Sequence, residues 1–142
     1  MKISARNQFE GKITALKSGQ VNAEVELSTA GGDKIVAVVT QGSVEALGLE
    51  LGKSVVALIK APCVMILADD GALAFSARNR LSGTVTRLVR GAVNAEVVIQ
   101  LAGGSEVYSV ITNDAAQELG LKEGGTATAL FKAGSVVLGV GK

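Results

Sequence analysis

Apolar and polar residues alternate along several short stretches of the first half of the chain. The alternation is strict over residues 21–27, which is typical of a β-strand that buries one face. Looser alternation over residues 9–16 and a β-branched run at 35–39 predict two more strands. Apolar runs at 55–59 and 64–67 predict a fourth and a fifth strand.

The period changes between the third and the fourth predicted strands. Residues 43–47 predict a short helix, for which Thr40 or Ser43 can accept a hydrogen bond from a free backbone N–H group. Gly48 is placed to end this helix in the left-handed conformation, and Leu49 then folds back as an apolar contact.

This order of elements, three strands, a short helix and two strands, is that of a five-stranded Greek-key barrel of the OB type. An SH3-like barrel is the nearest alternative. Residues 30–33 are expected to form the hairpin connection between the second and third strands. Gly11 is expected at a bend or bulge of the first strand.

The whole pattern occurs twice. A shift of 72 residues aligns residues 3–70 with 75–142 without a gap, and 27 of the 68 aligned pairs are identical. Ser4–Asn7 returns as Ser76–Asn79, which marks the start of each copy. Such a repeat indicates two copies of one small unit rather than one larger domain.

We therefore predict an all-β chain of two tandem OB-like barrels, with domains at residues 1–70 and 71–142. The linker at 69–74 is short, so the two barrels should pack side by side. Units of this size bury only a small core, and they usually gain stability by packing on one another or by oligomerisation.

Composition excludes several classes of function. With 14 basic and 13 acidic residues, three Phe, one Tyr and no Trp, the chain offers neither a basic field nor stacking aromatics for nucleic acid. Without His and with a single Cys, it can form no disulfide within the chain and no His/Cys metal site. The one thiol, Cys63, lies in an apolar stretch and is expected to be buried.

The same residues argue against an enzyme and against a membrane protein. No nucleophile–base pair and no phosphate-binding loop of the usual kind is present. The most apolar window, residues 55–68, is interrupted by Lys60 and Pro62 and is too short to span a bilayer. No signal peptide is recognisable at the N-terminus, so a cytoplasmic location is expected.

Hydrogen-bond donors recur at matched positions in the two copies: Ser4 and Ser76, Arg6 and Arg78, Thr40 and Thr112, Lys60 and Lys132. Hydroxyls, backbone amides at a helix start and one or two cations can together hold a small oxyanion. The alternative for each is structural: the hydroxyls cap turns, and the lysines are solvated strand ends.

A longer pattern gives these residues a family context. The chain resembles the Mop family of molybdate-binding domains (molbindins), in a two-domain form, over segments Ser4–Asn7, Gly11, Val21–Val25, Val39–Ser43, Leu47–Leu49 and Ile59–Ala61. The resemblance implies OB-like barrels that bind molybdate or tungstate for storage and homeostasis, without a redox cofactor. It also implies a homo-oligomer, a trimer for a two-unit chain, with anions held at interfaces between units.

The resemblance further implies the site residues. One class of site would be lined by Ser4, Arg6, Thr40, Ser43, Lys60 and Ala61. Its counterpart in the second copy would be lined by Ser76, Arg78, Thr112, Lys132 and Ala133. On a weaker basis, Asn22, Ala23, Asn94 and Ala95 are added. In this grouping, Ser4 and Arg6 donate to a site completed by Thr40 and Lys60 of another unit, and Asn7 is structural.

The two copies differ at two of these places. Ser43 is matched by Ala115, and Pro62 by Gly134, so the two classes of site are expected to differ in affinity. Two other functions stay open: a molybdate-sensing module that regulates a partner protein, and an oligonucleotide-binding OB module, which the composition disfavours.

Overall fold

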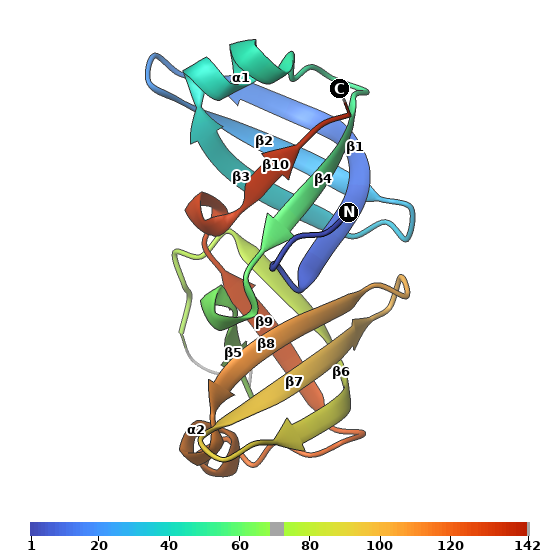
Figure 1. The fold of residues 1–142 in the computed structure, drawn as a ribbon, viewed down its shortest axis with the longest axis vertical. Helices are drawn as coiled ribbons and strands as arrows, with labels where there is room; N and C mark the ends of the chain where they lie inside the picture. Colours follow the sequence, from blue (N-terminus) through green and yellow to red (C-terminus); the bar gives the residue numbers. More distant parts are fainter. Residues whose placement is uncertain (69–72, 142) are drawn as a thin grey trace.

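The computed structural model describes residues 1–68 and 73–141, which form two five-stranded sheets, each curled into a barrel (Figure 1). The first half contains β1 (Asn7–Ser18), β2 (Asn22–Thr29), β3 (Lys34–Thr40), α1 (Gln41–Leu47), β4 (Ser54–Ile59), the 3₁₀ turn η1 (Ala61–Cys63) and β5 (Met65–Leu67). The second half repeats this order with β6 (Asn79–Arg90), β7 (Asn94–Leu101), β8 (Glu106–Thr112), α2 (Asn113–Glu118), β9 (Thr126–Phe131), η2 (Ala133–Ser135) and β10 (Val137–Gly139).

These elements confirm the all-β prediction of tandem OB-like barrels with one short helix each. The predicted helix ends are also confirmed. Ser43 N–H donates to Thr40 Oγ1 at 3.0 Å, and Gly48 ends α1 at φ 62°. Leu49 then folds back, because its N–H donates to the carbonyl oxygen of Val44 at 3.0 Å and its side chain is buried.

The fifth strands are exchanged between the halves. The strand order is β10-β4-β1-β2-β3 in one sheet and β5-β9-β6-β7-β8 in the other. Strand β5 of the first half therefore pairs with β9, and β10 of the second half pairs with β4. In Figure 1 the chain crosses the junction between the barrels at both places. The domain boundary predicted between residues 70 and 71 lies outside the described residues.

Two buried asparagines fasten the halves at this junction. Asn7 Nδ2 donates to the carbonyl oxygen of Tyr108 at 2.8 Å, and Tyr108 N–H donates to Asn7 Oδ1 at 2.7 Å. Asn79 makes the same pair of bonds to the backbone of Val36, both at 2.8 Å. Each amide thus acts like one residue of an additional strand, on the outer edge of β8 or β3. Since both asparagines are 1% exposed, these bonds satisfy groups that water cannot reach.

The two hairpin tips also meet at the junction. The β2–β3 and β7–β8 hairpins lie side by side in Figure 1, and a Cβ atom placed on Gly31 would collide with the carbonyl oxygen of Gly103. The reverse substitution would collide with Gly31 in the same way. Only glycine allows the two backbones to approach so closely.

Gly11 serves a different purpose from the one expected. The register of β1 shifts between Ile13 and Ala15, so the bulge lies there and not at Gly11. A Cβ atom on Gly11 would collide with the carbonyl oxygen of Ser28 on β2. The glycine therefore permits a close approach of two strands, as Gly83 does in the second half.

The prediction that Cys63 is buried is wrong. Cys63, the last residue of η1, is exposed. The buried positions around this turn are taken by Ala61 and Val64, both 2% exposed. The apolar composition around Cys63 therefore does not predict burial inside a 3₁₀ turn of three residues.

Among the described residues, no helix is long and apolar enough to cross a membrane.

The asparagine contacts lead to a test of stability. We expect Asn7→Asp to lower the free energy of unfolding by about 2–4 kcal/mol, since a buried carboxylate would face the Tyr108 carbonyl without a donor. Urea unfolding at neutral pH measures this. The same amide-to-acid change at the exposed turn residue Gln20 (Gln20→Glu) is the control, with an expected change below about 0.5 kcal/mol. Equal stability of the two variants would contradict a fastening role for Asn7.

Candidate functional site

The Ser4–Asn7 segment presents its side chains in alternation. Ala5 and Asn7 are 7% and 1% exposed and anchor the segment, whereas Ser4 and Arg6 are exposed. In the second copy Asn79 is buried and Ala77 is half-buried, whereas Ser76 and Arg78 are exposed. The asparagine anchor therefore determines where each arginine leaves the backbone.

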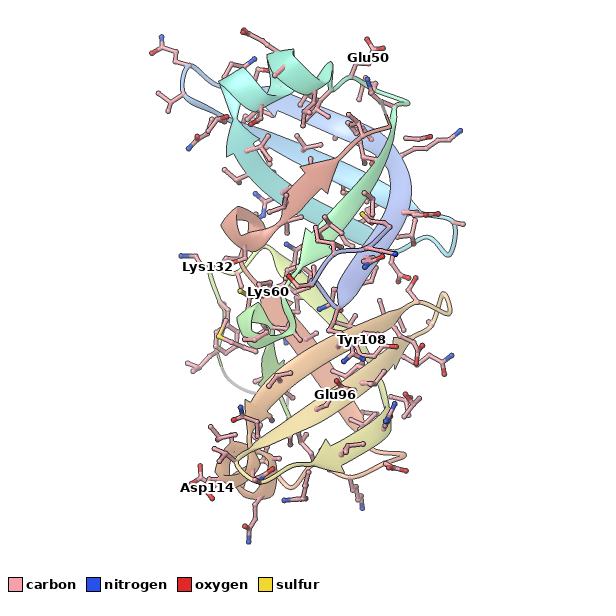
Figure 2. The ribbon with its side chains drawn as sticks, viewed as in Figure 1. Glu50, Lys60, Glu96, Tyr108, Asp114 and Lys132 are labelled. Carbon is pink, nitrogen blue, oxygen red and sulfur yellow. The ribbon has the colours of Figure 1, made fainter. Side chains whose placement is uncertain are left out.

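Arg6 lies against the outer face of the other half. Its Nη1 donates to Glu96 Oε2 at 2.6 Å, and its Nη2 to Oε1 at 3.5 Å. The guanidinium carbon lies 4.6 Å from the centre of the Tyr108 ring, a cation–π arrangement. Figure 2 labels Glu96 on β7 and Tyr108 on the adjacent β8. Arg6 is thus held by a carboxylate and an aromatic ring of the second half.

Arg78 makes the reciprocal contact to the first half. Its Nη2 lies 2.8 Å from Glu24 Oε1, and the hydrogen bond from Arg78 lowers the pKa of the Glu24 carboxyl. The same carboxylate raises the pKa of the guanidinium. Val36 stands where the other copy has Tyr108, so Arg78 lacks the aromatic contact. A cavity of about 180 Å³ adjoins the pair, lined by Ala15, Leu16, Lys17, Glu24, Glu26, Val36 and Arg78.

Strand pairing brings the backbone of Lys60 close to that of Arg6, and the backbone of Lys132 close to that of Arg78. Asn7 pairs with Ile59 on β4, so continuing that antiparallel register places Arg6 opposite Lys60. The pairing of Asn79 with Phe131 relates Arg78 to Lys132 in the same way. Both lysines are exposed and precede the turns η1 and η2, and Figure 2 shows them near the junction of the barrels.

The predicted site residues near the junction of the barrels form two sets, which we call the inner groups. One inner group comprises Ser4, Arg6, Lys60 and Ala61, and the other comprises Ser76, Arg78, Lys132 and Ala133. Ala61 and Ala133 are buried and begin η1 and η2, so they can contribute only backbone atoms to a ligand at the surface.

The remaining predicted residues form two outer groups at the far ends of the barrels. Strand register pairs Thr40 with Asn22 in one half and Thr112 with Asn94 in the other. The hydroxyl groups of Thr40 and Ser43 lie 2.8 Å apart. The outer groups are Asn22, Ala23, Thr40 and Ser43 in the first half, and Asn94, Ala95 and Thr112 in the second.

The expected combination of Thr40 and Lys60 from one unit is not what the fold provides. Lys60 follows Ile59, which pairs with the first residue of β1. Thr40 lies near the other end of β1, because it pairs with the start of β2, and the start of β2 pairs with the end of β1. The 12 residues of β1 separate them by roughly 35 Å along the strand. A site that uses both kinds of donor therefore needs an inner group and an outer group from different copies of the chain.

Sequence reasoning missed three residues that contact the arginines: Glu24, Glu96 and Tyr108. A signal was present for the two glutamates, because Val21–Val25 and Val93–Val97 form the longest identical run of the repeat. No comparable signal marked Tyr108, which lacks a counterpart in the first copy. Within the described residues no group of three His, Cys, Asp or Glu side chains could hold a metal ion.

Comparison with known proteins identifies relatives of this two-unit arrangement. The family model described as "TOBE domain" matches residues 3–66 and again 76–138. A crystal structure of the cytoplasmic molybdate-binding protein ModG, with molybdate bound, is 53% identical and superimposes with a TM-score of 0.96 over 99% of this chain and 100% of that one.

Two curated relatives show similar levels of identity. The molybdenum transport protein ModE of Herbaspirillum seropedicae is 44% identical over 140 residues, covering 99% of this chain and 52% of ModE. The molybdenum-pterin-binding protein MopA of Rhodobacter capsulatus is 43% identical over 138 residues, covering 97% of this chain and 52% of MopA. The chain thus spans about half the length of the curated relatives it matches.

The lowered pKa of Glu24 predicts a pH-dependent contribution to stability. A depressed carboxyl pKa stabilises the folded state above the ordinary value of 4.5, and this contribution is lost as the pH falls through the lowered pKa. We therefore expect Glu24→Gln to be less stable than wild type at neutral pH, and the difference to disappear as the pH is lowered from 4.5 through the lowered pKa. Because the pair is partly exposed, the difference should be small and should shrink in high salt. Urea unfolding midpoints across this pH range measure it, and a difference that grows toward low pH would contradict the assignment.

Proposed function

Since this chain belongs to the TOBE domain family, as a tandem pair of Mop-type units, we propose that it binds molybdate, and tungstate in the same sites. The observation that carries the proposal is the end-to-end match with molybdate-bound ModG, at 53% identity and with full coverage of both chains to within 1%. The family is one of binding and regulatory proteins, and we propose no catalytic step.

The chemistry of the ligand suits the donors. Molybdate at neutral pH is a tetrahedral dianion that only accepts hydrogen bonds, so hydroxyls, backbone amides and cations at about 2.7–3.1 Å are appropriate partners. No bond between the metal and a protein atom is required, so a chain without His can bind molybdenum in the form of molybdate. No redox cofactor takes part. We propose as ligands the residues of the inner and outer groups defined above.

Separation of the two kinds of group leads to the proposed assembly. We propose a homo-oligomer, a trimer of this two-unit chain, in which inner groups of one copy meet outer groups of another. Exposed apolar side chains at matched positions support association, since Val21 and Val93 are 75% and 71% exposed, and Met65 and Val137 are 52% and 61% exposed.

The proposed physiological role is storage and homeostasis of molybdate in the cytoplasm, the compartment of ModG. A second candidate is a sensing module that acts on a partner protein. It is favoured by the DNA-binding transcriptional dual regulator ModE of Escherichia coli, of which this chain covers 52% at 36% identity. Neither role requires nucleic acid or a membrane as a direct partner of this chain.

Calorimetry of the purified protein with molybdate, tungstate, sulfate and phosphate, together with elemental analysis, tests the proposal. We expect molybdate and tungstate to bind much more tightly than the two smaller anions. Molybdate affinity no greater than that for sulfate would overturn the proposed function. Light scattering tests the assembly, and a stable monomer that still binds tightly would overturn the interface sites.

A separate prediction concerns the two classes of outer group. Ala115 lacks the hydroxyl of Ser43, although its N–H donates to Thr112 Oγ1 at 3.0 Å just as Ser43 N–H donates to Thr40. We expect Ala115→Ser to tighten the weaker class of site by about tenfold, the value of one added hydrogen bond to a charged ligand. Calorimetry measures the change, and Ser43→Ala is the matched control with a loss of similar size. No gain from Ala115→Ser would contradict the assignment of these sites.

A further inference from the structure

Each candidate anion-binding arginine carries a carboxylate from the opposite half of the chain. Arg6 is bound by Glu96, and Arg78 by Glu24, with shortest N–O distances of 2.6 and 2.8 Å. The two pairs are related by the sequence repeat, so they are a built feature of both inner groups and not a chance contact of one side chain.

These carboxylates oppose the binding of an anion at the same guanidinium. A paired arginine has little net charge to offer, and a dianion placed beside the pair would be repelled by the carboxylate. If the anion instead replaces the carboxylate, the guanidinium keeps its charge-assisted hydrogen bonds and exchanges one oxygen acceptor for another.

Resting on the proposed function, we propose that Glu96 and Glu24 occupy Arg6 and Arg78 in the anion-free protein and are displaced when a tetrahedral oxydianion binds. The two glutamates thereby set the affinity and the selectivity of the inner groups. A monovalent anion brings no more charge than the carboxylate that it would displace, whereas a dianion brings twice that charge and several acceptor oxygens.

Exposure of the pairs makes this exchange feasible. The Arg6 and Glu96 side chains are 51% and 21% exposed, and those of Arg78 and Glu24 are 53% and 36% exposed. Ion pairs in such positions are weak, because water and salt screen them. The carboxylates therefore hold the arginines in place without blocking them permanently.

The two halves differ in what happens after displacement. Released Glu24 lies directly opposite Lys17 in the β1–β2 register, and Lys17 already contributes to lowering its pKa. Released Glu96 faces Val89 at the matched position and has no such replacement partner there. Tyr108 also keeps Arg6 in place once its carboxylate has left. Removing the charge of Glu96 should therefore improve binding more than removing that of Glu24.

The experiment compares Glu96→Gln, Glu24→Gln and the double variant with Glu10→Gln by calorimetry, using molybdate and chloride as probes. Glu10 is an exposed carboxylate on β1, and the control makes the same change in net charge without releasing an arginine. We expect Glu96→Gln to bind molybdate about 5-fold more tightly than Glu10→Gln, with a smaller gain for Glu24→Gln. The advantage of molybdate over chloride should fall in the double variant.

The outcomes separate this inference from the proposed function. If all variants bind molybdate and neither Glu96→Gln nor Glu24→Gln binds more tightly than Glu10→Gln, displacement is overturned and molybdate binding stands. Weaker binding by Glu96→Gln would also overturn displacement, since it would make the carboxylate a support for the bound state. If neither the wild type nor any variant binds molybdate, both proposals fail. Thermal unfolding of each variant checks that the fold is intact.

Discussion

Pairing of β10 with β4, and of β5 with β9, is the contact on which the arrangement of the molecule depends. Neither five-stranded sheet contains only residues of its own half. The buried amides of Asn7 and Asn79 reinforce the exchange, because each binds a backbone edge in the opposite half. The halves are therefore joined by main-chain hydrogen bonds, which fix the geometry of the junction more firmly than side-chain packing alone would.

That junction determines what the candidate binding residues can do. The inner groups are placed by the start of β1 or β6 and the end of β4 or β9, and their arginines reach across to glutamates of the other half. The outer groups lie at the far ends of the barrels, where Thr40 and Thr112 begin the short helices. A single chain thus holds the two kinds of candidate group far apart, a distribution that is consistent with the proposed sites between copies.

The sequence predicted local structure well and long-range pairing poorly, for a physical reason. Alternation and capping are read from neighbouring residues, so β2, α1 and the Gly48 cap could be predicted. Strand exchange could not, because the two copies share one pattern and β5 fits the edge of β4 or of β9 equally well in terms of apolar alternation. The separation of Thr40 from Lys60 likewise follows from the register along β1, which no local pattern reveals.

Strand exchange also has a consequence for biosynthesis. Strand β10 belongs to the sheet of the first half, yet the ribosome makes it only after the rest of the second half. Until then the first sheet has four strands, and β4 carries an open edge of the kind that favours aggregation. The first half therefore cannot complete its fold while the second half is being made, whereas β5 can join the second sheet as soon as β9 has been made.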